Sequence, residues 1–303
     1  MQQRAQPAGQ GAGGRMRRAW RLLRDAAAGW LAHDGARLGS SIAFYAIFAL
    51  APLLVISIAM AGAVFGEEAA RGAIFGQLEG LVGADAARGA QSLLEAAWRE
   101  DHGGWASVVA IGTLLVGATG VFVELRNALD TVWSLEEPKD KPALTLLLRA
   151  RLAAFALVLA IGFLAIVSLL LSAALAAAAH WVSGGFELLR VLLRLIEATL
   201  SLAVLTAAFA LLMRWLPAQR PPRRAVWVGA VASALLFAVG KNFIGLYLGR
   251  AGVTTAYGAA GSFVVLILWV YYSAQLLLFG AELGRAAAAD ATAAPVTTGS
   301  GRG

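Results

Sequence analysis

Cysteine is absent from this 303-residue chain, and its absence excludes several kinds of site at once. Without a thiol there is no disulfide, no cysteine nucleophile and no cysteine-ligated zinc or iron–sulfur centre. Histidine is scarce as well, because only His33, His102 and His180 occur, each in or beside a separate loop. Their spacing contains no pairing of the kind that holds a metal ion. We therefore expect neither a metal site nor a cofactor.

Charge and enzymatic motifs are also sparse. Only 14% of the residues are charged, and 59% are hydrophobic. The sequence has no glycine-rich nucleotide loop ending in Lys-Ser/Thr and no Gly-x-Ser-x-Gly nucleophile elbow. A net charge of +7 does not indicate nucleic acid, because the basic residues flank apolar runs and form no patch with interleaved aromatics. We expect no enzymatic activity and no nucleic-acid partner.

What the chain does contain is six apolar runs, each long enough to cross roughly 30 Å of hydrocarbon. They predict an all-α, polytopic transmembrane bundle over residues 16–285, between disordered tails at 1–15 and 286–303. Pro52 lies inside the first run, where it removes a backbone donor and predicts a kink. The predicted spans are Leu38–Gly66, Trp105–Val123, Leu152–Ala179, Phe186–Met213, Val226–Gly249 and Ala260–Leu283.

Basic residues alternate strongly between the two sides of these spans. The N-terminal segment has seven Lys and Arg, the second loop five, the fourth loop four and the C-terminus two, eighteen in all. The first, third and fifth loops together have four. Because Lys and Arg accumulate on the cytoplasmic side, the sequence predicts a bacterial inner-membrane protein with both termini in the cytoplasm.

Two segments outside the spans have amphipathic patterns. Between Met16 and Arg37, apolar residues recur at helical spacing among arginines, which predicts an interfacial helix on the cytoplasmic headgroups. The alternative is a soluble helix packed on the bundle. The outer loop Glu67–Gly104 predicts two short amphipathic helices separated by a break at Gly83–Asp85.

Polar residues inside the spans are the best candidates for a functional site, because an ionisable group in hydrocarbon is costly unless it pairs or lines a wet cavity. Glu197 on the fourth span and Lys241 on the fifth lie at similar depths, so they could form a structural ion pair or handle a substrate or proton. Tyrosines at such depth usually need a partner. The candidate intramembrane site comprises Arg194, Glu197, Lys241, Asn242, Tyr271, Tyr272 and Gln275.

A second polar group lies near the cytoplasmic end of the second span. It could form a gate, or it could be a solvated helix end. Its members are Glu124, Arg126, Asn127 and Asp130.

Four blocks of sequence resemble the YihY/BrkB family of bacterial inner-membrane proteins, once labelled ribonuclease BN. They are Ser40–Leu54 (SSIAFYAIFALAPLL), Gly117–Trp133 (GATGVFVELRNALDTVW), Gly240–Arg250 (GKNFIGLYLGR) and Tyr257–Glu282 (YGAAGSFVVLILWVYYSAQLLLFGAE). The resemblance runs from about Trp20 to Arg285. It implies a six-span inner-membrane protein, linked by family name to virulence and suspected of transport, but it supplies no catalytic or ligand residues to carry over.

The resulting expectation is a transporter-like protein, or one that handles lipids or envelope precursors. The alternative is a structural or assembly factor of the cell envelope that transports nothing. A ribonuclease finds no support in these residues. Membrane lipids are the expected partners, whereas the sequence fixes neither a substrate nor an oligomeric state.

Overall fold

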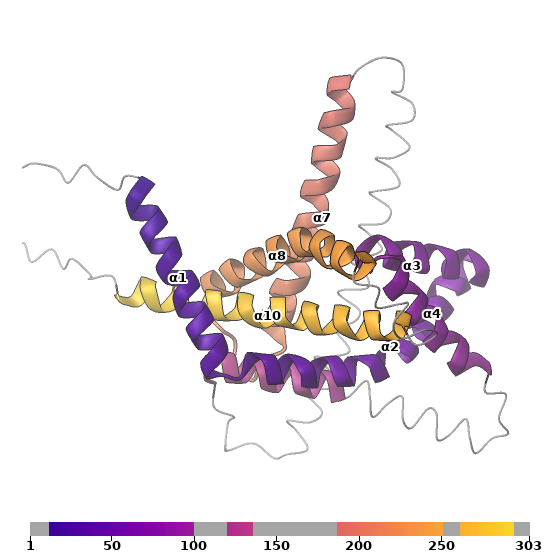
Figure 1. Ribbon diagram of the computed structural model, residues 1–303, viewed down its shortest axis with the longest axis horizontal. Helices are drawn as coiled ribbons and strands as arrows, with labels where there is room; N and C mark the ends of the chain where they lie inside the picture. The colour runs from indigo at the N-terminus through magenta and orange to yellow at the C-terminus, as the bar shows by residue number, and fades with distance from the viewer. Residues whose placement is uncertain (1–11, 100–119, 136–186, 251–260, 294–303) are drawn as a thin grey trace, which may run out of the picture.

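The computed structural model describes residues 12–99, 120–135, 187–250 and 261–293. Every regular element in these ranges is an α-helix (Figure 1), so the predicted all-α class is confirmed for this part of the chain. A further helical segment covers residues 120–132. The remaining elements are α1 (Ala12–Ala32), α2 (Gly35–Phe65), α3 (Glu67–Val82), α4 (Ala84–Arg99), α7 (Glu187–Trp215), α8 (Arg223–Arg250) and α10 (Gly261–Ala293).

Within the described residues, three helices are long and apolar enough to cross a membrane. They are Leu195–Trp215 in α7, Arg223–Lys241 in α8 and Gly261–Thr292 in α10, at the places of the fourth, fifth and sixth predicted spans. The first predicted span forms α2, which is helical on both sides of Pro52. The third predicted span, and the second before residue 120, lie outside the described residues.

Helix α10 is the centre of the arrangement and contacts α8, α2, α4 and α1. In Figure 1 it runs between α8 above and α2 below. Its N-terminal half contributes Val265, Leu266 and Trp269 to an apolar cluster with α2 and α4. Its C-terminal half joins a second cluster with α2, α8 and the 120–132 segment. One helix therefore supports the core along its whole length.

Part of the α8 surface that faces α10 is built from small residues, whereas a row of large apolar side chains on α8 points outward. Gly229 packs against the backbone oxygen of Gly280, so that a Cβ at either glycine would collide with the facing helix. Such close backbone approach is how helices pack in lipid, where burying large apolar groups gives no advantage. The large residues at every fourth position instead point outward, and these are Trp227, Val231, Leu235, Val239 and Phe243.

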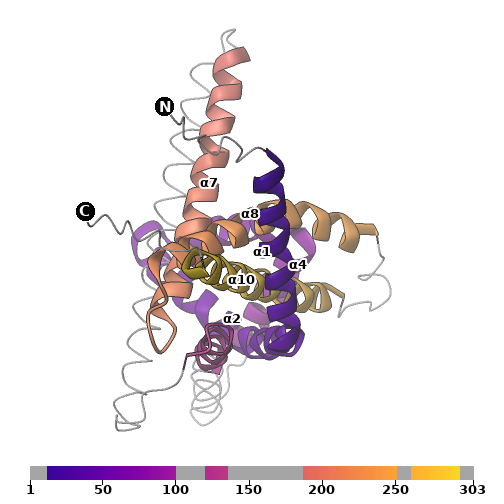
Figure 2. The same ribbon diagram turned by 90° about the vertical axis from the view of Figure 1, so that its left-hand side faces the viewer.

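The first helix differs from its predicted bounds. We expected it over Met16–Arg37, but α1 ends at Ala32, because Asp34 adopts a left-handed conformation with φ of 53°. Aspartate tolerates this conformation better than most residues. Arg37 therefore belongs to α2. In both views α1 lies steeply across α10, close to the C-terminal end of α10 (Figures 1 and 2).

The last helix continues beyond the predicted end of the sixth span. We expected a disordered tail from residue 286, whereas α10 runs to Ala293. Alanine is the strongest helix former, and residues 286–289 are all alanine. Arg18 of α1 also pairs with Asp290, with 2.7 Å between Nε and Oδ2, which holds this extension against α1.

The segment predicted as the outer loop contains two helices, α3 and α4, as expected. They meet at Gly83, whose φ of 85° is easily reached only by glycine. Helix α4 then lies on the N-terminal end of α10, where Gly89 faces the backbone oxygen of Ser262. Helices α1 and α4 thus cover opposite ends of α10.

Candidate functional site at the contact of α1 with α10

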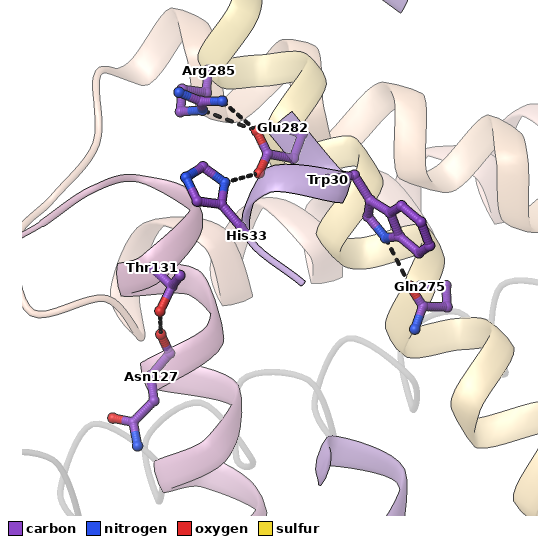
Figure 3. Close-up of polar contacts among 7 residues, drawn as sticks. All are labelled: Trp30, His33, Asn127, Thr131, Gln275, Glu282 and Arg285. Atoms are coloured by element: carbon purple, nitrogen blue, oxygen red, sulfur yellow. Dashed lines mark hydrogen bonds and ion pairs between the residues drawn. The ribbon is translucent and has the colours of Figure 1, made fainter. Parts of the chain in front are cut away.

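A buried carboxylate lies where α1 meets α10. Glu282 has no exposed side-chain surface, and both of its oxygens are occupied. Nδ1 of His33 lies 2.5 Å from Oε1, and Arg285 donates to Oε2 from Nε at 2.9 Å, with Nη2 2.8 Å away. Figure 3 shows His33, from the turn after α1, and Arg285, from α10, converging on this carboxylate. A buried carboxylate is costly unless it is paired and hydrogen-bonded, and His33 and Arg285 give each oxygen of Glu282 a partner.

A second polar contact lies nearer the middle of α10. The indole nitrogen of Trp30 donates to Oε1 of Gln275 at 2.8 Å (Figure 3), and Nε2 of Gln275 donates to the backbone oxygen of Gly35 at 3.1 Å. Gln275 therefore holds the end of α1 and the start of α2 together. We call Trp30, His33, Gln275, Glu282 and Arg285 the α1–α10 polar cluster.

Two glycines make room for this cluster. A Cβ at Gly29 of α1 would collide with the carboxylate of Glu282 and the guanidinium of Arg285, and one at Gly39 of α2 with the amide of Gln275. The absence of a side chain at these positions lets the polar groups reach across. A larger residue at either position would have to displace the polar ends of these side chains.

The predicted gate residues form a separate, smaller polar group. Asp130 is buried and accepts a hydrogen bond from the backbone nitrogen of Ala218 at 2.8 Å, while Nε of Arg126 lies 3.4 Å from its other oxygen. Asp130 thus ties the 120–132 segment to the turn after α7. Asn127 is exposed, and its backbone oxygen accepts from Thr131 (Figure 3), whereas Glu124 is half-buried.

The predicted intramembrane site is divided between different surroundings. Glu197 and Lys241 are both exposed, and no ion pair among the described residues joins them. Figure 1 shows why, since the N-terminal half of α7 projects away from α8. The side chains of Arg194 and Asn242 lie outside the described part.

The three candidates on α10 are each half-buried. Gln275 belongs to the α1–α10 polar cluster. Tyr272 makes an edge-to-face contact with Trp269, with 6.0 Å between ring centroids, and its hydroxyl packs against Gly240. The structure therefore brings Tyr272 to α8 and Gln275 to α1, and it places neither next to Glu197.

Sequence reasoning did not identify the pairing of His33 with Glu282. The spacing of the histidines excludes a metal site but indicates no carboxylate partner for His33. Two signals were available. Gln275 and Glu282 are seven residues apart and so share one face of a helix, and His33 follows Gly29 by four residues, in the turn after α1. Nothing in the spacing, however, tells which two helices face each other.

The cluster joins the end of α1 to α10 through one shared acceptor. Glu282 has no exposed side-chain surface, whereas the side chain of His33 is 20% exposed. Each oxygen of the carboxylate faces a different partner, His33 on one side and Arg285 on the other. The position of α1 against α10 is therefore tied to the side chain of Glu282. Among the described residues, no group of His, Asp and Glu could hold a metal ion.

The family model for virulence factor BrkB matches residues 26–300 of this chain. A UPF0761 membrane protein of Azotobacter vinelandii is 27% identical over 270 residues, covering 87% of this chain and 62% of the relative. Its counterpart in Pseudomonas aeruginosa is 32% identical over 183 residues, covering 60% of the chain and 42% of the relative.

A third UPF0761 membrane protein, from Cronobacter sakazakii, is 30% identical over 177 residues, which is 55% of this chain and 57% of the relative. The chain thus spans between 42% and 62% of the length of these three proteins. No solved structure matches it significantly.

Proposed function

The chain belongs to the virulence factor BrkB family of membrane proteins, and from that premise we propose that it is a transporter-like protein that handles lipids or envelope precursors. The observation that carries the proposal is Glu282, a carboxylate without exposed surface on an apolar helix. Ionisable residues within membrane helices commonly mark substrate, ion or proton pathways, so Glu282 is a candidate functional residue. No chemistry on a covalent bond is required, so we propose no enzymatic activity.

The proposed topology is six spans in the bacterial inner membrane, with both termini in the cytoplasm. The ratio of eighteen to four basic residues across the predicted loops supports this orientation. The pairing of Arg18 with Asp290 supports a common side for the two terminal helices. Reporter fusions at Gly83 and Pro138 test the topology, since the proposal requires them on opposite faces of the membrane.

Reconstitution of the full chain in liposomes tests the activity. With a fluorescent phospholipid and an impermeant quencher added outside, we expect the protein to expose inner-leaflet lipid that empty liposomes protect. Glu282→Gln should slow this exchange, because the amide cannot form the ion pair. Glu79→Gln is the matched control, since Glu79 is an exposed acid on α3. Wild-type protein that moves neither lipid nor any ion or small solute contradicts the proposal.

A scaffold or assembly factor is the alternative function. It is favoured by the complete occupation of both Glu282 oxygens by protein partners, as in a purely structural ion pair. In that case Glu282→Gln lowers the melting temperature in detergent but leaves any reconstituted flux unchanged at temperatures where the variant is folded. A parallel measurement of melting and flux separates the two functions.

A further inference from the structure

Helix α1 exposes an apolar stripe on the side that does not pack against α10. Its face toward α10 contains the buried residues Ala26 and Gly29. Exposed large apolar residues then recur at spacings of four, three and eight, which places them on one side of a helix. We call these residues the apolar stripe: Met16, Trp20, Leu23 and Leu31, with exposed fractions of 73%, 70%, 44% and 68%.

A basic stripe runs beside the apolar one. Arg17, Arg21 and Arg24 each follow a member of the apolar stripe by one position, and all three are exposed. One position is a rotation of 100° about the helix axis, so the two stripes are neighbours. Arg18 is not part of this group, because it points to the other side and pairs with Asp290.

The placement of α1 fits a membrane surface. It crosses α10 steeply near the end of that long apolar helix (Figures 1 and 2). A helix that lies across the end of a spanning helix runs along the membrane plane at the level of the headgroups. Trp30 and His33 of the α1–α10 polar cluster fasten the C-terminal end of α1 to α10.

We propose that α1 binds the surface of an anionic phospholipid bilayer, with the apolar stripe among the acyl chains and the three arginines on headgroup phosphates. Guanidinium groups form paired hydrogen bonds with phosphate oxygens, and basic residues near the membrane are attracted by anionic lipid. Tryptophan favours the boundary between headgroups and acyl chains. This inference stands independently of any transport activity.

The natural lack of cysteine allows a direct test on the full chain. Leu23→Cys is labelled with an environment-sensitive fluorophore, and the protein is placed in nanodiscs of phosphatidylcholine alone or mixed with phosphatidylglycerol. We expect a blue shift and quenching by a spin label on the acyl chain, both stronger with phosphatidylglycerol. The triple variant Arg17→Gln, Arg21→Gln, Arg24→Gln should lose this dependence on anionic lipid.

The matched control removes the same number of exposed arginines elsewhere, through Arg37→Gln, Arg223→Gln and Arg224→Gln, and should keep the response. Should the first triple variant not fold, added salt serves instead, because it screens the attraction and should weaken the quenching of the wild type. A label that stays in water with both lipids overturns the proposal. So does a label that is shielded equally in both but escapes the acyl-chain quencher, since a protein surface would then cover the stripe.

Discussion

The two halves of α10 make different kinds of contact with their neighbours. The N-terminal half places Trp269, Val265 and Leu266 against apolar side chains of α2 and α4. From its middle onward, α10 also packs in an apolar cluster with α8 and the 120–132 segment, but this part additionally carries Gln275 and Glu282, which bond to Trp30 and His33. The apolar half gains stability in proportion to the contacts it makes, whereas the polar half depends in addition on every polar group keeping its partner. Stability and function are therefore expected to respond differently to substitution in the two halves.

The largest effect on stability is expected at Trp269 in the apolar half. Its side chain is 2% exposed, so Trp269→Ala should leave a cavity and lower the free energy of unfolding by about 3–5 kcal/mol. Titration with SDS from a mild detergent measures this. Trp269→Phe should lower the free energy of unfolding less than Trp269→Ala does, because the indole nitrogen has no hydrogen-bond partner in the described part of the chain. Equal losses for both variants contradict this account of the site.

The next largest effect is expected at Glu282 in the polar half. Glu282→Ala removes the shared acceptor of His33 and Arg285 and should lower the free energy of unfolding by about 2–3 kcal/mol. This is less than for a fully buried pair, because both partners are partly exposed to solvent. The same SDS titration reports it. A double-mutant cycle with His33→Ala isolates the interaction of this pair. Additive losses of stability would show that the two side chains do not interact.

The sequence predicted the helices but not which of them touch. Length and hydropathy were sufficient for α7, α8 and α10, because hydrocarbon thickness sets a minimum length for a span. The break at Gly83 was also readable. The end of α1 at Asp34 was not, because it depends on one left-handed residue. Glu197 and Lys241 matched in depth, yet depth does not determine which helix faces which.

The polar cluster could be inferred only from packing. Glu282 and Gln275 share one face of α10, which a helical period reveals. Their partners on α1 follow from the turn at Asp34 and from the space left by Gly29 and Gly39. These are tertiary facts, and a single sequence does not encode them in any local pattern.

A moderate effect is expected at Trp30, the partner of Gln275. Trp30→Phe keeps an aromatic ring but removes the indole nitrogen that donates to Gln275. The free energy of unfolding should fall by about 1 kcal/mol, because a half-buried amide oxygen loses its hydrogen bond. Combining it with Gln275→Met should recover part of the loss, since no unpaired amide oxygen then remains at position 275, although the bond to the backbone oxygen of Gly35 is lost as well. Thermal melting in detergent compares the three variants. A double variant less stable than the sum of the single ones would argue against the contact.

The smallest effect is expected at the exposed end of the contact. Arg18→Ala breaks the pair with Asp290, whose two side chains are 53% and 27% exposed. Solvent screens such a pair, so the loss should stay below about 1 kcal/mol and should shrink in high salt. Melting at low and high salt measures both quantities. A loss as large as that of Glu282→Ala would mean that the position of α1 depends on its outer end and not on the buried carboxylate.

The central claim is that α1 lies against the C-terminal end of α10, and cysteine cross-linking in native membranes tests it most directly. Arg18→Cys with Asp290→Cys, treated with a short bifunctional maleimide, should give an internally cross-linked chain, because the native side chains touch. Arg18→Cys with Glu79→Cys should not, since α3 lies toward the other end of α10 (Figure 1). Both pairs labelled by a monofunctional maleimide but neither cross-linked would contradict the account.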